Sequence, residues 1–597
     1  MRKLFSILSL LIVASMVLAA CGGTAPTTEE APAQPEQPSQ PEQPSQPEQP
    51  EAAMCETLVM GAEPMHEVQD LRVNLGTFPD IIDPQKSSFV NEIAHLITIY
   101  EGLTKLNGDL ETVPGAAESW EYNEDSTVLT FKLRDCLAYS DGTLLNAERF
   151  RYSLLRNVNP ETAGEYAAIT DEINGAPEWR GGDAAAQAIV EESLVASHPD
   201  GSACTGYDDP ECTIFTITLS RSAPYFHTVM SLWVTFPAKE ELITEGGETW
   251  WLESQYHIGN GPYILESWEP QVNARFVPNP YYWDGQPSVN LEYAYITDTA
   301  VAFEAYKNDE FDIVPLAAED FDTIMADPVL SQEANIYPGS CTFAMMFHQL
   351  KPPFDNQAVR EAFAYALDRE SWVEDVLQGL GAPTLTWIPP GFPGYQEGET
   401  RLAFDPEKAV QTLNDAGYTV EGGQLIGPDG TAIEVVDTFS DTPRNRTRNE
   451  WLVAKWREVL GIDIALNPVE STTYTALTKD IETTPQMYIL GWCADYPDPQ
   501  NWLSVYWKTG AFGERIGYSN PELDALLLEA DTEGDPATRA ELYAQAQDML
   551  VSGSPVAFMW NNVNTYLVKP WVKDLALTPM DAGYPGIYAP TQYYVEK

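Results

Sequence analysis

The chain has 597 residues, 44% of them hydrophobic, which is enough for more than one globular domain. Its 32 basic and 90 acidic residues give a net charge of −58. A field of that sign repels polyanions, so no nucleic-acid partner is expected. Only six of the acids lie in residues 24–53. Most of the charge therefore belongs to the body of the protein, where its simplest role is solubility.

The N-terminus is typical of an export signal. Arg2 and Lys3 precede an apolar run over residues 4–20, which is too short to favour a permanent membrane span. The run ends in LAACG at residues 18–22, which resembles a bacterial lipobox. We expect a signal peptide over residues 1–20 and a lipid anchor on Cys21, on the extracytoplasmic side of a cell membrane. The alternative is a plain secretory signal that happens to contain a cysteine.

A low-complexity segment follows the lipobox. Residues 24–53 are mostly Thr, Ala, Pro, Glu and Gln, with a repeat PEQPSQ from Pro35 onward. Such a segment has no apolar surface to offset chain entropy, and its prolines favour an extended spacer. The sequence predicts a disordered tether over residues 21–54 and a folded body from Cys55.

Helix and strand signals are interleaved along the body. Apolar residues alternate with polar ones at 128–133 and 213–219, which predicts strands. Three helices are predicted from apolar periodicity, caps and glycine stops: 357–378 with Asp355 or Asn356 as the cap, 405–417 with a first-turn proline, and 449–460 ending at Gly461. This mixture favours α/β lobes over an all-β sandwich.

Seven cysteines are present, and six remain if Cys21 is lipidated. An even number in an exported protein suggests disulfides, with fifteen possible pairings. Cys204 and Cys212 flank a turn-rich segment, so a local bridge is plausible there. No Cys-x-x-Cys pair occurs, and neither a zinc ribbon nor a thioredoxin-type site is indicated.

No motif for bond-making chemistry stands out. The chain has no Gly-x-Ser-x-Gly elbow and no phosphate-binding loop of the Gly-x-x-x-x-Gly-Lys-Ser/Thr type. His66-Glu67 begins like a zinc-protease motif, but Asp70 stands where the second histidine is needed. The six histidines are scattered, and carboxylates are too numerous for any pair to be diagnostic. No catalytic residue, metal or cofactor is predicted.

Several blocks together resemble a known family. They are PGAAESWE at 114–121, LTFKLR at 129–134, YSDGT at 139–143 and AERFRYS at 147–153. This stretch resembles the signature of bacterial extracellular solute-binding proteins of family 5, the peptide- and nickel-binding group that serves ABC importers. Further blocks follow in the family's order: NGPY at 260–263, NPYYW at 279–283, PFDN at 353–356, ALDR at 366–369, GWCADY at 491–496 and LVKPW at 567–571. NPETA at 159–163 and the WCAD block resemble the oligopeptide binders most closely.

The resemblance implies a fold of two α/β lobes with an additional third domain, closing by a hinge over the ligand. The boundaries it implies are residues 55–100, 220–340 and 557–597 for lobe I, 101–219 for the extra domain and 341–556 for lobe II. It also implies a disulfide between Cys341 and Cys493. Cys55 and Cys136 would then remain to pair with each other.

The same resemblance proposes a binding site. Asp495 would pair with the α-ammonium of a peptide, which is a strong charge-assisted interaction in a closed cleft. Backbone groups of Gly491 and Cys493 would pair with the ligand main chain, Trp492 would form a pocket wall, and Tyr166 would contact the ligand. The plainer alternatives are a turn or cap role for Asp495, because Tyr-Pro-Asp-Pro follows it, and an interface role for Tyr166.

Two departures concern the ends of the ligand. Some oligopeptide binders carry basic residues for the peptide carboxylate where this chain has Asp480 and Ile489. No acidic partner is expected near Ser88. The sequence therefore leaves open a longer, cationic, amide-capped or non-peptide ligand.

The sequence predicts a monomeric, membrane-anchored binding protein that captures peptides for ABC permease subunits and is not an enzyme. An oligosaccharide or metal-chelate binder is the main alternative, since 16 Trp and 29 Tyr could stack on sugars. A secreted hydrolase is a further one.

Overall fold

The computed structural model describes residue 55 and residues 57–597. The predicted signal peptide, Cys21 and the whole of the predicted tether lie outside the described residues. Within the described part, no helix combines the length and the apolar character that crossing a membrane requires. The described chain is a mixed α/β structure, and its largest element is a sheet of eleven strands.

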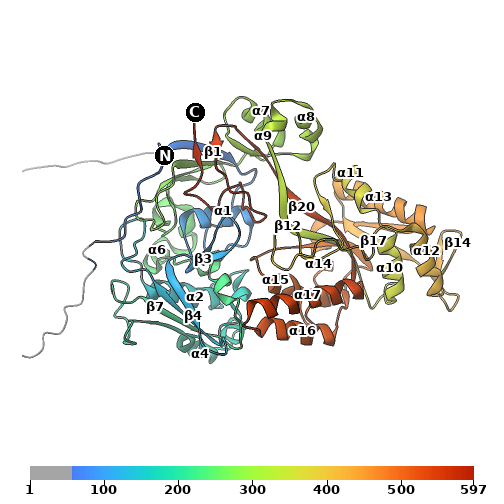
Figure 1. Ribbon diagram of the computed structural model, residues 1–597, viewed down its shortest axis with the longest axis horizontal. Coiled ribbons are helices and arrows are strands. Elements are labelled where there is room, and N and C mark those ends of the chain that lie inside the picture. The colour runs from blue at the N-terminus through green and yellow to red at the C-terminus, as the bar shows by residue number, and fades with distance from the viewer. Residues whose placement is uncertain (1–54, 56) are drawn as a thin grey trace, which may run out of the picture. The chain divides into compact units, whose positions relative to one another are not determined.

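Two long strands form the centre of this sheet. β12 (Ala334–Phe347) and β20 (Val556–Val568) pair antiparallel. Apart from the dark-red C-terminal segment after β20, they separate the blue-green elements from the yellow-to-red elements in Figure 1. On one side of β12 lie β19 (Met487–Cys493), β17 (Val435–Ser440) and β18 (Ile464–Val469). Beyond β20 lie β11 (Ile313–Pro315), β1 (Gln69–Asn74), β10 (Val289–Ala294), β9 (Asn273–Pro278) and β8 (Tyr263–Glu269).

The buried apolar side chains show that this sheet serves two lobes. One large cluster is built mainly by residues 71–293 and 566–595. Two others are built mainly by residues 344–560. β20 contributes Tyr566 to the first cluster and Ala557 to one of the others, so it runs from one core to the next. The predicted two-lobed α/β fold is confirmed.

A separate four-stranded sheet packs into the first cluster. Its order is β4 (Ala117–Tyr122), β5 (Val128–Leu133), β7 (Ile214–Thr218) and β6 (Leu194–Ser197). β5 has the predicted bounds, and β7 is one residue shorter than predicted at each end. Phe215 and Ile217 are fully buried, as alternation along a half-buried strand requires. α2 (Ala147–Val158) packs on β6 and β7.

The helix predicted at 357–378 is two helices. α10 (Gln357–Tyr365) begins after Asn356, whose side chain accepts a hydrogen bond from the Ala358 amide at 2.9 Å. α11 (Arg369–Asp375) begins after Asp368, which caps it through the Ser371 amide at 3.1 Å. An N-cap residue has extended backbone angles, so Asp368 ends the helical run that the periodicity alone would continue.

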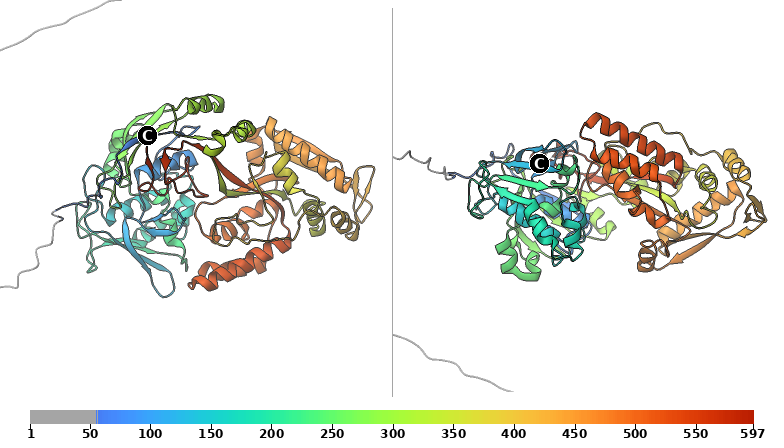
Figure 2. Two further views of the ribbon diagram at one scale, coloured as in Figure 1. Left: turned by 45° about the horizontal axis from the view of Figure 1, so that its top comes forward. Right: turned by 90° about the horizontal axis from the view of Figure 1, so that it is seen from below.

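The other two predicted helices are present with one correction. α12 (Pro406–Asp415) has Asp405 as its cap, and Gly417 follows it with φ +83°. α13 (Pro443–Leu460) starts six residues earlier than predicted, because Thr442 caps it and Pro443 occupies its first turn. Its end at Gly461, with φ +75°, is as predicted. α15 (Pro499–Trp507), α16 (Pro521–Thr532) and α17 (Pro536–Gly553) pack together below the sheet (Figures 1 and 2).

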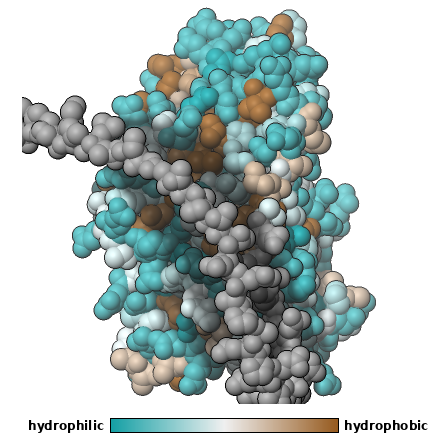
Figure 3. Space-filling model, turned by 90° about the vertical axis from the view of Figure 1, so that its left-hand side faces the viewer, coloured by the Kyte–Doolittle hydropathy of each residue, from teal (hydrophilic) through white to brown (hydrophobic). Residues whose placement is uncertain are grey.

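Three disulfides join Cys55 to Cys136, Cys204 to Cys212, and Cys341 to Cys493. They are the three pairs given above. The face seen in Figure 3 is mostly hydrophilic with scattered hydrophobic residues, in keeping with the charge of the chain.

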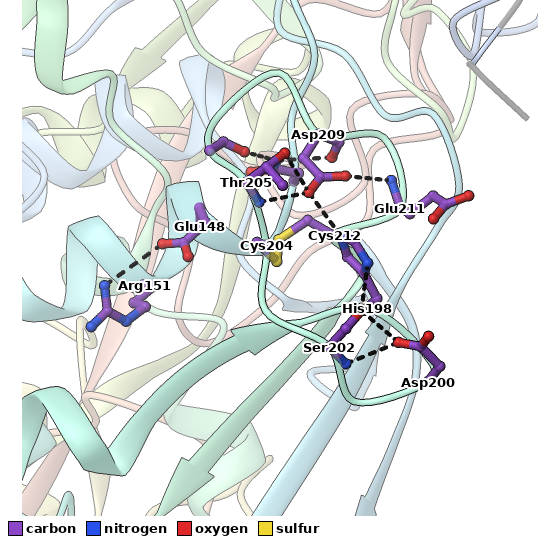
Figure 4. Close-up of a disulfide and its surroundings, with 12 residues drawn as sticks. Glu148, Arg151, His198, Asp200, Ser202, Cys204, Thr205, Asp209, Glu211 and Cys212 are labelled. Atoms are coloured by element: carbon purple, nitrogen blue, oxygen red, sulfur yellow. Dashed lines mark hydrogen bonds and ion pairs between the residues drawn. A yellow bond between two sulfur atoms is a disulfide. The ribbon is translucent and has the colours of Figure 1, made fainter. Parts of the chain in front are cut away.

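The loop around Cys204 also gathers potential metal ligands. His198, Cys204 and Asp209 place one ligand atom each within 4.8 Å of the others. Figure 4 shows how they are engaged: the sulfur of Cys204 is bonded to Cys212, and His198 Nε2 lies 2.7 Å from Asp209 Oδ2. A disulfide sulfur is not a thiolate ligand, so the group is a structural cross-link of the loop.

Candidate ligand-binding site

A cavity of about 500 Å³ lies where the two lobes meet. Its walls come from segments that the sequence analysis assigned to all three domains, including α1 (Val90–Ile99), Tyr166, the end of β19, and β20. The polar residues of its lining are Ser88, Tyr166, Ser231, Ser340, Asp495, Asn562, Asn564, Tyr566, Asp581 and Tyr588. A cavity shared by two lobes changes its shape when the lobes move, as a ligand-enclosing site requires.

Asp495 lines this cavity directly after β19. Its carboxylate accepts a hydrogen bond from the Tyr166 hydroxyl at Oδ1 and one from Asn501 Nδ2 at Oδ2, the latter at 2.7 Å. Asn501 also holds the Asp495 amide, with its Oδ1 3.0 Å away. Burial raises the pKa of the Asp495 carboxyl, and the hydrogen bonds from Tyr166 and Asn501 oppose this only in part. Within the described chain no cation pairs with Asp495, so a ligand cation would meet an uncompensated carboxylate.

The cap role belongs to a different aspartate. Asp498 precedes α15 and accepts a hydrogen bond from the Gln500 amide at 2.8 Å. It also forms an ion pair with Arg539 at 2.8 Å. Asp495 is therefore not needed to start the helix, and its carboxylate stays at the cavity.

The outer edge of β19 is available for backbone pairing. β17 pairs with β19 only at Met487. Along an antiparallel pair the backbone groups alternate between the two edges. The Ala494 amide donates to the Ser340 carbonyl of β12, so residue 494 and every second residue before it face β12. Residues 489, 491 and 493 therefore direct their backbone groups to the opposite edge of β19. There the Ile489 carbonyl accepts from Tyr474 at 2.7 Å, and Gly491 and Cys493 lie toward the cavity end.

Gly491 has a packing role as well. A Cβ at this position would lie 2.6 Å from Phe343 Cδ1 and 2.7 Å from the Thr342 carbonyl oxygen of β12. Only glycine therefore leaves room for the aromatic ring of Phe343 to pack against this strand. Gly491 itself lines neither cavity described here, so a role in ligand binding would come from its backbone alone.

A second cavity of about 310 Å³ adjoins Asp495 and Tyr166, which line both spaces. Trp492 forms part of its wall, with Phe512 at a ring separation of 4.9 Å. Besides Asp495, its acids are Glu165, Asp171 and Glu172. The last two are paired with Arg180 and Arg221. Glu165 has no cation partner within the described chain. This space has the aromatic walls and the position of a pocket for a ligand side chain.

One feature differs from the sequence analysis. No acid was expected near Ser88, yet the Ser88 hydroxyl donates a hydrogen bond to the Glu165 carboxylate at 2.7 Å. The two residues are 77 positions apart, and no local pattern connects them. The adjacency of Glu165 to Tyr166 is the only sequence signal that could have placed this acid at the site.

The two positions expected to lack a basic group lie away from the first cavity. Asp480 is exposed and accepts a hydrogen bond from the Glu482 amide at 2.8 Å. Ile489 packs against a lobe II core cluster. Neither residue lines the cavity that holds Asp495.

Comparisons with known proteins agree with this architecture. The model of bacterial extracellular solute-binding proteins, family 5 (middle part), matches residues 111–514. The periplasmic murein peptide-binding protein MppA of Escherichia coli is 27% identical over 87% of this chain and 92% of its own. The oligopeptide-binding protein OppA of Bacillus subtilis is 24% identical, with 96% of each chain covered.

Solved structures show the same fold. The unliganded open form of MppA superposes with a TM-score of 0.73 at 24% identity, covering 90% of this chain and 98% of that one. OppA of Haemophilus influenzae, in complex with the peptide RPPGFSPFR, gives 0.65 at 23% identity, covering 89% and 99%. With a family model matched over most of its length, this chain belongs to the bacterial extracellular solute-binding proteins of family 5.

Proposed function

We propose that this protein captures peptides with a free amino end outside the cytoplasm and delivers them to an ABC importer without altering them. The observation that carries the proposal is Asp495: a carboxylate at an interlobe cavity, held by Tyr166 and Asn501 and unpaired with any cation of the described chain. An α-ammonium has three donors and one positive charge, which suits such a group.

The neighbouring geometry supports a peptide rather than a simple amine. The open edge of β19 leads to Asp495, and an extended ligand could pair there as an added strand. A side chain at the first ligand position would then face the aromatic wall of Trp492 and Phe512. Glu165 adds a second negative group beside Ser88.

Anchoring by Cys21 completes the proposal. A lipidated cysteine followed by a proline-rich tether would keep the binding lobes near the permease while leaving them free to move. Membrane fractionation of the wild type and a Cys21→Ser variant tests this part separately, because the variant should leave the membrane while its ligand binding is unchanged.

Native mass spectrometry of the purified protein tests the central proposal. We expect an intact co-purified peptide, released on denaturation. Titration calorimetry with that peptide should then show a loss of about 2–5 kcal/mol in Asp495→Ala, the cost of removing one partner of a desolvated charge pair. An unchanged affinity in Asp495→Ala, or turnover of the peptide, would contradict the proposal.

A further inference from the structure

The lining of the two cavities has a consistent charge. Asp495 and Asp581 line the first cavity, and Glu165, Asp171, Glu172 and Asp495 line the second. Asp171 and Glu172 are paired with Arg180 and Arg221, so Asp495, Asp581 and Glu165 are the acids without a cation partner among the described residues. Among the residues that the structure describes, neither lining includes a lysine, an arginine or a histidine. A peptide with two free ends carries a carboxylate as well as an ammonium. Its carboxylate would be desolvated here without a positive group, which is costly.

Asp581 holds a second anionic position in the first cavity. It belongs to the segment after β20, whereas Asp495 follows β19, so the two carboxylates come from different lobes. Asp581 accepts hydrogen bonds from the Tyr337 hydroxyl at 2.7 Å and from the amide and hydroxyl of Thr578 at 3.0 and 2.8 Å.

No basic side chain offsets the charge of Asp581. The residue is 8% exposed, and no ion pair joins it to any described cation. Burial raises the pKa of its carboxyl to about 6 in spite of the three hydrogen-bond donors. A cation brought by a ligand would relieve this uncompensated burial.

The other polar residues of the first cavity are uncharged. Asn562 and Asn564 of β20 line the cavity. Asn564 Nδ2 also donates to the carbonyls of Thr578 and Pro579, which ties the Asp581 segment to the strand. Amides can bind a peptide or a capped end, but they do not neutralise a carboxylate.

Two arginines of lobe II could in principle serve a ligand carboxylate. The guanidinium of Arg515 lies 4.6 Å from the ring centre of Phe512, which lines the second cavity, and no ion pair joins Arg515 to a described carboxylate. Arg448 of α13 is half-buried, with its guanidinium 5.7 Å from the ring centre of Trp560, and no carboxylate of the described chain pairs with it. Neither arginine lines either cavity. Both therefore serve as controls for the alternative that closure brings a cation to the ligand.

From these observations we infer that the ligand is dicationic and has no free carboxylate: one ammonium lies at Asp495 and a second positive group lies at Asp581. Amide-capped peptides with a basic residue and linear diamines belong to this class. The inference rests on the proposed function for the peptide part of the ligand, but the charge requirement is independent of it.

The test uses four tetrapeptide probes of equal length in titration calorimetry at pH 7.5 and low salt. They are Ala-Ala-Ala-Ala with a free carboxylate, the same peptide as an amide, Ala-Ala-Ala-Lys-amide, and N-acetyl-Ala-Ala-Ala-Lys-amide. 1,5-Diaminopentane is a fifth, non-peptide probe. We expect Ala-Ala-Ala-Lys-amide to bind at least tenfold more tightly than either the tetra-alanine amide or the acetylated peptide, and the free-carboxylate peptide to bind most weakly of the free-amine probes.

Three variants sharpen the result. Asp581→Asn should abolish the advantage of the lysine amide over the alanine amide. Arg448→Gln and Arg515→Gln should each change no affinity. The wild-type probe series needs no variant, so it decides the question even if Asp581→Asn folds poorly.

The outcomes separate the two proposals. If the free-carboxylate peptide binds as tightly as its amide, the dication inference is overturned while the peptide function stands. Loss of that binding in Arg448→Gln or in Arg515→Gln would then identify the cation that holds the carboxylate. If 1,5-diaminopentane binds and no peptide does, the peptide function fails and the charge inference stands. If no probe binds, neither survives.

Discussion

The hydroxyl of Tyr166 donates a hydrogen bond to the carboxylate of Asp495, although 329 residues separate them in the chain. The hydroxyl supplies one of the two side-chain donors to that carboxylate. Tyr166 also packs on Trp233, with 5.1 Å between ring centres, so its position is fixed by the first lobe. The pair thus connects a residue of one lobe to the proposed ammonium site of the other.

A double-mutant cycle would measure this connection. Tyr166→Phe removes the hydroxyl alone, and we expect it to lower the free energy of unfolding by about 1.5–3 kcal/mol, the range for a hydrogen bond to a charged group. In an Asp495→Ala background the same change should have little effect, since the acceptor is absent. Denaturant unfolding at pH 7.5 gives both values. Equal effects in the two backgrounds would show that the bond carries no coupling.

Replacing Asp495 by asparagine should change stability and binding in opposite directions. Burial raises the pKa of this carboxyl, so a buried ionised Asp495 costs the empty protein stability. Asp495→Asn removes that cost and should raise the melting temperature, while affinity for a free-amine peptide falls at least thirtyfold. Glu421→Gln, at an exposed end of β14 (Thr419–Glu421), is the matched control and should change neither. A loss of both stability and affinity in Asp495→Asn would indicate structural damage instead.

Asp437 should give the protein a pH-dependent stability that is unrelated to ligand binding. It is fully buried in β17, neither carboxylate oxygen has a hydrogen-bond partner among the described atoms, and burial raises the pKa of its carboxyl to about 8. An unfolded aspartate titrates near pH 3.9. Between those values the folded state holds one proton more, so this group's contribution to stability is present at acid pH and is lost as pH rises toward 8, by up to about 1.4 kcal/mol per pH unit.

Asp437→Asn removes this titration. Relative to the wild type, the variant should therefore gain roughly 2–4 kcal/mol in unfolding free energy between pH 5 and pH 8. Urea unfolding at several pH values measures the difference, with Glu421→Gln again as the control. A difference between variant and wild type that stays flat across this range would mean that Asp437 is solvated or paired in the folded protein.

The disulfides should differ in what they contribute to stability. Cys341–Cys493 closes a chain separation of 152 residues, and Cys204–Cys212 one of 8. Restricting a longer loop removes more entropy from the unfolded chain. The stabilisation expected from the two cross-links therefore differs by roughly 2–3 kcal/mol. The double variant Cys341→Ser/Cys493→Ser should be destabilised by that much more than Cys204→Ser/Cys212→Ser in non-reducing denaturant unfolding. The reverse order would show that native contacts outweigh chain entropy.

Local signals predicted much of the fold from sequence. The bounds of β5 and the end of α13 follow from alternation and from a glycine stop, which are encoded within a few residues. The break between α10 and α11 was missed because Val359, Phe363 and Leu367 continue one apolar face up to Asp368. Only the capping bond of Asp368 reveals that the chain turns there.

The site was only partly predictable. Asp495 could be named from its motif, since the surrounding residues resemble a family block. Its partner Asn501, in the first turn of α15, could not be predicted from a local pattern. Nor could the contact between Glu165 and Ser88, which are 77 residues apart. Asp581 carries no motif, and its place in the cavity depends on how the chain after β20 returns to the first lobe.

The interruption of the β12–β20 ladder has a mechanical consequence. Pairing passes from Pro338–Val563 to Thr342–Asn561, so three residues of β12 lie opposite Asn562 alone. The Cys341 amide donates a hydrogen bond across this gap to Asn562 Oδ1 at 2.7 Å. The two strands have no paired backbone residues across this gap, so a rotation of one lobe against the other would disturb the ladder least at this point. The same gap borders the cavity, so a solute that engages Asn562 would act directly on this part of the ladder.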